Sequence, residues 1–371
     1  MAGHLAIPPQ RDETLSSWLY RQSKLHGLPP QSYTSISFPS IEIWTRDIDR
    51  WLPESSMMVI SESTRMPLSQ VASMTLAGKY SEILGGIKSD GVTSWLLPVG
   101  VYHRQRKRHG QQFCPICFQQ RAMLKLKWRL GFVSVCEDHK ALLIDGCQVC
   151  GQPLTMFYVD PLRSTVCSGC GKRLNPAADT QKPKRSTGRS EFVELCASFS
   201  GRIFSHRNAD KSPALAVNAD LHGLRALLSV QLNKNQGRRM HKTWSARFCL
   251  PPVQAQSGRI EFLRSRCRHR LIAISEMALR QGTEEIVQDL VEHGVTRECI
   301  AECQLGKSAW LATHVIPHLK SNQRAPKSPP GRKGEMIDPL LSLRRMLRHK
   351  ESRVRAQARA CRISSMLDKS A

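Results

Sequence analysis

Seven of the 13 cysteines in this 371-residue chain fall within 57 residues and form a regular series with one histidine. The series runs in four pairs, each spaced by two residues: Cys114 and Cys117, Cys136 and His139, Cys147 and Cys150, Cys167 and Cys170. A turn of this spacing directs two ligand atoms at one ion, about 2.3 Å from each sulfur. Eight such ligands fill two tetrahedral sites, so the sequence predicts two Zn²⁺ ions.

The order of the pairs favours one assignment of the ligands. If consecutive pairs share an ion, the first site is Cys₃His and the second is Cys₄, and the loops they close are short. An interleaved arrangement, first pair with third and second with fourth, remains open. In the consecutive assignment neither site has a free position for water or substrate, which is typical of structural zinc.

The spacing beyond the ligands repeats as well. A leucine follows the first ligand of the last three pairs by seven residues, at Leu143, Leu154 and Leu174. Gly151 and Gly171 directly follow a second ligand, and glycine permits the positive φ that such a turn needs. The repeat therefore favours metal binding independently of the ligands.

Charge divides the chain unevenly. The net charge is +25, yet residues 1–100 carry 8 basic and 9 acidic side chains, so the excess lies in the remaining residues. Residues 101–130 hold eight basic side chains and no acid, which favours contact with phosphate over the alternative of solubility alone. From this stretch we predict a nucleic-acid or partner contact through Arg104, Arg106, Lys107, Arg108, Lys125, Lys127 and Arg129.

Helical periodicity dominates on both sides of the cysteines. Residues 12–28 predict a helix capped by Asp12 or Thr14 and ended by Gly27. Residues 67–86 could form a helix-turn-helix around Gly78, although core packing gives the same spacing. Residues 284–319 partly resemble a DNA-binding helix-turn-helix, with a generic helical hairpin as the alternative.

These elements predict a mainly α protein with small zinc-binding modules between two helical domains. The expected division is an N-terminal helix-turn-helix-like domain at 1–110, tandem zinc fingers at 111–175, a linker at 176–190, a C-terminal helical domain at 191–320, a second linker at 321–338 and a basic C-terminal helix at 339–371.

Several functions are excluded or disfavoured. Gly306-Lys307-Ser308 lacks the first glycine of a phosphate-binding loop, and no strand precedes it. A zinc nuclease or hydrolase needs an open metal position or clustered carboxylates, which the ligand pattern does not offer.

No run is long enough to span a bilayer, so we expect a soluble, intracellular protein. Cys299 and Cys303 lie one helical turn apart, and we interpret them as small buried side chains.

The motifs together resemble the TniQ family. The resemblance is carried by Phe113-Cys-Pro-Ile-Cys117, by Leu126-Lys-Trp-Arg-Leu130, by Val135-Cys-Glu-Asp-His139 and by Cys147-Gln-Val-Cys150-Gly151. The opening Asp12-Glu-Thr-Leu-Ser-Ser-Trp-Leu19 is similar to the family's first helix. The match covers about residues 8–175.

This resemblance implies a transposition target-selection protein that is not an enzyme. Proteins of this kind mark an insertion site and recruit the AAA+ regulator TnsC, which brings in the transposase. The short length is similar to members of CRISPR-associated transposons, which ride as dimers on a crRNA-guided Cascade complex. Longer, TnsD-type members read target DNA directly, and this remains the alternative. The resemblance implies a homodimer in the bacterial cytoplasm, associated with the nucleoid when bound to its target.

Overall fold

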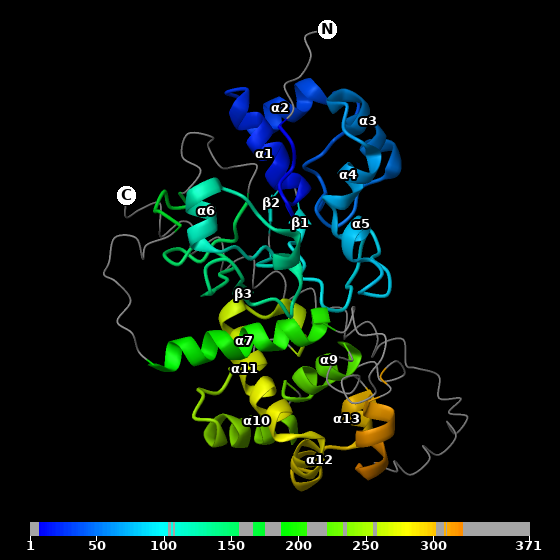
Figure 1. Cartoon of the computed structure of the whole chain (residues 1–371), viewed down its shortest axis with the longest axis vertical. Coiled ribbons are helices and arrows are strands. Elements are labelled where there is room, and N and C mark those ends of the chain that lie inside the picture. The colour runs from blue at the N-terminus through cyan, green and yellow to red at the C-terminus, as the bar shows by residue number, and fades with distance from the viewer. Residues whose placement is uncertain are drawn as a thin grey trace, which may run out of the picture. The chain divides into compact units, whose positions relative to one another are not determined.

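The computed structural model describes residues 7–102, 105–106, 108–155, 166–174, 187–205, 221–232, 236–254, 258–301, 308 and 310–321. Most of these residues are helical, and the strands are short (Figure 1). The expectation of a mainly α protein with small modules bearing Cys/His clusters is confirmed. No helix in this part of the chain is both long and apolar enough to cross a membrane.

Five helices form the N-terminal part: α1 (Leu15–Leu25), α2 (Pro30–Ser37), α3 (Glu54–Thr64), α4 (Leu68–Ser73) and α5 (Leu76–Tyr80). The predicted first helix is confirmed, because the Thr14 hydroxyl accepts a hydrogen bond from the Ser17 amide and Gly27 has a φ of 66° after its end. Asp12 does not cap it. Its carboxylate instead accepts from the Tyr80 hydroxyl at 2.9 Å and pairs with Lys79.

A separate apolar cluster holds these helices together. Trp18 and Leu19 of α1 meet Phe38, Ile60 and Val71, all almost completely buried. Burial of such large apolar side chains is the main source of stability in a small helical unit.

The turn predicted at Gly78 lies elsewhere. Residues 74–75 connect α4 to α5, and Gly78 lies inside α5. A Cβ atom at this position would approach the Ala72 carbonyl oxygen to 2.2 Å, so the glycine lets α5 pack closely on the end of α4.

The cysteine-rich segment is built from very short elements. The antiparallel pairs are β1 (Val101–Tyr102) with β2 (Gln105–Arg106) and β3 (Val135–Cys136) with β4 (Ala141–Leu142). Between the pairs lie α6 (Pro115–Arg121) and a 3₁₀ turn at Leu126–Arg129. Elements this short bury little surface by themselves, so other bonds must hold the segment in shape.

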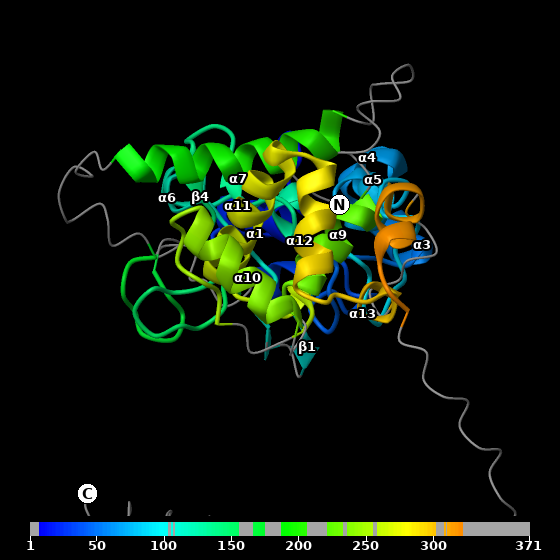
Figure 2. The ribbon, with the colours of Figure 1, turned by 90° about the horizontal axis from the view of Figure 1, so that it is seen from below.

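Helices return in the last part: α7 (Thr187–Ser205), α9 (Leu221–Val230), α10 (Gln236–Arg247), α11 (Ser265–Gln281), α12 (Thr283–Glu292) and α13 (Arg297–Ala301). Helix α11 packs against α7, α9, α10 and α12, and is the centre of this group (Figures 1 and 2). A 3₁₀ turn at Ile260–Phe262 precedes α11, and a π-helical turn at Leu311–Val315 continues into a 3₁₀ turn at Ile316–His318.

Buried contacts join the C-terminal helices to the cysteine-rich segment. Trp95 donates from its indole to the Leu221 carbonyl oxygen at 3.0 Å, and its backbone amide donates to Glu261 at 2.9 Å. The Ser200 hydroxyl of α7 donates to the Phe132 carbonyl oxygen at 2.7 Å. One continuous apolar core therefore extends from Tyr20 of α1 to Leu319.

Parts of the predicted organisation lie outside the described residues. These are nearly all of the linker at 321–338, the whole basic tail at 339–371, most of the linker at 176–190 and the residue Cys303. The last four residues of the predicted linker at 176–190 begin α7, which starts at Thr187.

Candidate metal centres

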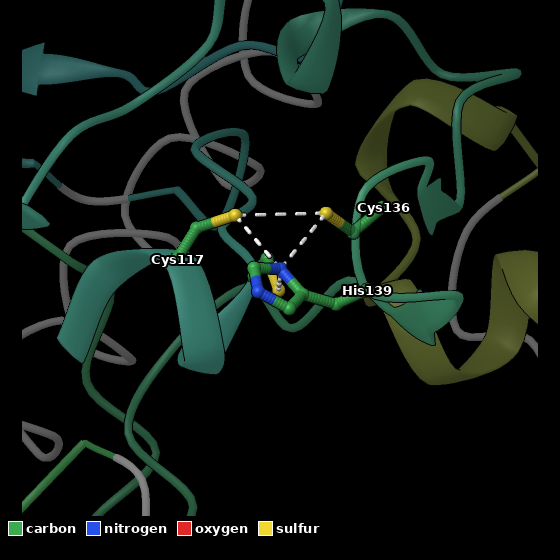
Figure 3. Close-up of side chains that lie close together, drawn as sticks. Cys117, Cys136 and His139 are labelled. Carbon is green, nitrogen blue, oxygen red and sulfur yellow. Dashed lines mark hydrogen bonds between the residues drawn. The ribbon is translucent and has the colours of Figure 1, made fainter. Parts of the chain in front are cut away.

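The first candidate metal centre gathers two ligands from α6, one from β3 and one from the turn that follows β3. Cys114 caps α6, Cys117 lies inside that helix, Cys136 ends β3, and His139 follows in the turn to β4. The Cys117 sulfur is 3.6 Å from the Cys136 sulfur and 3.1 Å from Nδ1 of His139 (Figure 3). The same Nδ1 atom is 3.7 Å from the sulfurs of Cys114 and Cys136.

The second candidate metal centre uses two turns that face each other. The Cys147 sulfur is 3.7 Å from that of Cys170, and the Cys150 sulfur is 3.6 Å from that of Cys167. In each of the two centres the four ligand atoms lie within 4.8 Å of one another. The structure thus brings the eight predicted ligands together in the consecutive arrangement, not in the interleaved one.

These distances fit tetrahedral zinc. With zinc–sulfur bonds of about 2.3 Å, the sulfurs of a tetrahedral site lie roughly 3.8 Å apart, and sulfur and nitrogen lie roughly 3.5 Å apart. Three thiolates with an imidazole, or four thiolates, are the donor sets of structural zinc. Both centres could therefore hold a metal ion, with every position of a tetrahedron taken by the protein.

The same backbone bonds form both turns of the second centre. The Gly151 amide donates to the Cys147 carbonyl oxygen at 2.9 Å, and the Gly171 amide donates to that of Cys167 at 2.9 Å. The predicted positive φ is confirmed at both glycines, at 75° and 67°. In the first centre Lys140 takes the corresponding place with a φ of 46°. The three repeat leucines are all buried: Leu143, Leu154 and Leu174.

Crowded thiols change one another's acidity in the first centre. The hydrogen bond to Cys136 and then burial raise the pKa of Cys114, and burial raises the pKa of Cys117 to about 11. The hydrogen bond from Cys114 lowers the pKa of Cys136 to about 5. One thiolate is thus stabilised by neighbouring thiols, and a divalent cation would allow all three sulfurs to ionise.

Lys125 and Lys127 lie beside the first centre, largely buried, and form ion pairs with two exposed acids. The Lys125 ammonium contacts Asp138 at 2.6 Å and Glu137 at 3.6 Å, and Lys127 also pairs with Glu137. Both acids lie between the ligands Cys136 and His139, and the Lys125 side chain is only 10% exposed. The two lysines and the two acids thus form a network without net charge beside the ligands.

The structure corrects the prediction of a partner contact at Arg129. Its guanidinium is completely buried, pairs with both carboxylate oxygens of Asp47 at 2.6 and 3.1 Å, and donates to the Leu97 carbonyl oxygen. Burial acts to lower the pKa of Arg129, and the Asp47 carboxylate more than offsets this and raises it. Arg129 therefore anchors the N-terminal helices to the cysteine-rich segment and is out of reach of a phosphate.

The remaining predicted contacts are less completely described. Arg108 is exposed, and its guanidinium lies 4.3 Å from the ring centre of Phe262. Arg106 belongs to β2, while Arg104 and Lys107 lie outside the described residues.

Asp145 is a positioning residue that sequence reasoning missed. It lies two residues before Cys147, accepts from the Ser265 amide at 2.6 Å and pairs with Arg264 at 3.1 Å. These bonds satisfy an amide at the start of α11, so they connect the second metal centre to the C-terminal helices. No spacing signal could reveal a contact between residues 120 positions apart.

The described architecture is that of a mainly helical protein with two clusters of Cys and His that could each hold a metal ion. Residues 4–143 match the family model of TniQ, and the chain therefore carries a TniQ domain. This match confirms the resemblance read from the sequence. It includes α1 to α6 and the first metal centre, and it ends before Cys147. A search of curated proteins gave no match.

Proposed function

We propose that the chain is a non-enzymatic target-selection adaptor for transposition. The observation that carries the proposal is the TniQ match over residues 4–143, since this domain belongs to proteins concerned with transposition target selection. In the proposed role the chain docks as a dimer on a crRNA-guided Cascade complex in the bacterial cytoplasm. It then recruits a TnsC-type AAA+ ATPase to the target DNA.

The metal centres support a scaffold role. Each offers four protein ligands to one ion, and we propose that both hold structural Zn²⁺. The first centre joins α6 to the β3–β4 pair. The second centre lies beside Asp145, which binds the start of α11. Zinc would therefore fix the relative positions of short elements that have few other contacts.

The distribution of charge supports different binding roles for the N-terminal helices and for the rest of the chain. The nearly neutral helices α1 to α5 suit contact with protein, and the basic remainder suits contact with nucleic acid. Arg108 is an exposed cation of the basic stretch, and we propose that it acts there with Arg104, Arg106 and Lys107. We also retain the predicted domain boundaries as a proposal.

Direct reading of DNA by a helix-turn-helix at 284–319 is the alternative. The described part of this segment contains α12, a turn at Gly294 and α13. The surface of α12 exposes Glu284, Glu285 and Glu292, and these carboxylates would repel a phosphate backbone. The charge of α12 therefore favours the adaptor role over the alternative.

Affinity purification tests the proposed function. The tagged chain is purified from cells that express its neighbouring genes, and the bound protein and RNA are identified. We expect a stoichiometric short guide RNA, Cascade subunits and the ATPase. Recovery without RNA, together with protection of one DNA sequence by the purified chain, would contradict the adaptor role and establish direct recognition.

A further inference from the structure

A second basic segment, unrelated to the zinc ligands, runs from α10 into the start of α11. Residues 236–270 contain nine Lys or Arg and a single acid, Glu261, which is buried. Glu261 is bonded to Arg225 at 2.7 Å and to the backbone amide of Trp95. The acid therefore offers nothing to neutralise the surface of this segment.

Three cations of α10 share its exposed face. Arg238, Arg239 and Lys242 are all exposed, while Met240, His241 and Trp244 face the core. Arg238 and Lys242 are four residues apart, so they lie on neighbouring turns of one face, about 6 Å apart along the helix axis. None of the three forms an ion pair with a described residue, whereas Arg247 at the far end of the helix pairs with Asp289 at 2.7 Å.

This arrangement does not stabilise the helix. Two of the cations lie in the first turns of α10, near the positive end of the helix dipole. The spacing of Arg238 and Lys242 also places like charges side by side, which disfavours the helix. The carboxylate of Asp289 in α12 accepts hydrogen bonds from Arg247 at the C-terminal end of α10. The N-terminal half of α10 therefore keeps its positive charge.

We propose that the exposed face of α10, formed by Arg238, Arg239 and Lys242, binds the phosphate backbone of duplex DNA. The inference deepens the proposed function and rests on it only in taking target DNA as the partner. Charge complementarity selects a polyanion, and the chemistry of the face selects a duplex. Sites for single strands add exposed aromatic side chains, on which the bases stack, to a basic groove, but Trp244 of α10 is completely buried.

The test compares two charge-matched variants of the full-length, zinc-loaded protein. One variant carries Arg238→Gln, Arg239→Gln and Lys242→Gln. The control carries Lys24→Gln, Arg46→Gln and Arg65→Gln, which remove three exposed cations from the N-terminal helices. Binding to a short labelled duplex of arbitrary sequence, and to a single-stranded RNA of equal length, is followed by fluorescence anisotropy as salt is raised.

We expect the affinity of the α10 variant for the duplex to depend less steeply on salt than that of the wild type. Each phosphate contact contributes about 0.9 to the slope of log affinity against log salt, so three contacts contribute about 2.7. Between about 50 and 200 mM salt the wild type should then lose roughly 40-fold more affinity than the variant. Thermal stability should stay the same or rise, because repulsion within the helix is relieved.

Three results would overturn the inference. The first is a slope of log affinity against log salt that is the same for the α10 variant as for the wild type, even if the variant no longer binds a protein partner. The second is an equal loss in the control variant, which would mean that only total charge matters. The third is a larger loss on single-stranded RNA than on the duplex. Any of these would leave the adaptor proposal standing, because that proposal is tested by recovery of the guide complex and ATPase.

Discussion

Arg129 shows how one residue can be recognised by type and still be assigned the wrong role. Lys125 and Lys127 lie four and two residues before it, and this run of cations predicts a charged surface. In the structure its guanidinium is enclosed by Asp47, 82 positions away, and by the Leu97 carbonyl oxygen. Removing one partner of a buried ion pair destabilises the protein, because the remaining charge is then neither paired nor solvated by water.

At this scale we predict that Asp47→Asn destabilises the protein by about 3 kcal/mol, because it removes the carboxylate that pairs with the buried Arg129 cation. The measurement is the free energy of unfolding in urea. Glu42→Gln, which removes an exposed carboxylate, is the control and should change it by less than about 0.5 kcal/mol. Equal effects of the two substitutions would show that the ion pair does not support the fold.

The two clusters of candidate metal ligands were predictable from the sequence, and the reason is local. A two-residue spacing determines which side chains can reach one ion, and Gly151 and Gly171 supply the backbone conformation beside it. Long-range partners leave no such signal. The contact of Asp145 with the start of α11, and the separation of Lys125 from the surface, depend on packing between distant segments.

At the scale of elements the two metal centres differ in how deeply they are enclosed. Three ligands of the first centre, Cys114, Cys117 and Cys136, are buried in the main core. In the second centre only Cys147 and Cys167 are buried there, whereas Cys150 is exposed and Cys170 is half-buried. The first centre connects α6 to the β3–β4 pair inside that core. Loss of its ion should therefore disturb the core, and loss of the second ion should act more locally.

We predict that Cys150→Ser removes one zinc equivalent and leaves the helical circular dichroism nearly intact. Cys117→Ser should also remove one equivalent, but it should lower the thermal midpoint by more, since Cys117 is buried in the main core and Cys150 is exposed. Zinc content and thermal unfolding are measured for both variants. A wild-type zinc content in either variant, or a larger loss of stability from Cys150→Ser, would contradict this assignment.

The whole molecule combines a TniQ domain with a second metal centre and a helical part beyond it. The main apolar core runs from Tyr20 to Leu319 and therefore crosses the boundary where the family match ends. The helical class was predictable from periodicity. The packing of these parts against one another was not predictable, because it depends on long-range contacts such as the hydrogen bond from Trp95 to Leu221.

Site-specific insertion in cells tests the central proposal most directly. The transposase, the ATPase and the guide complex are expressed with or without this chain, and insertions at the intended target are counted by sequencing. An adaptor that selects the target predicts loss of insertion there when the chain is omitted, and recovery when the wild-type chain is restored. Insertion at the same site and frequency without the chain would contradict the account.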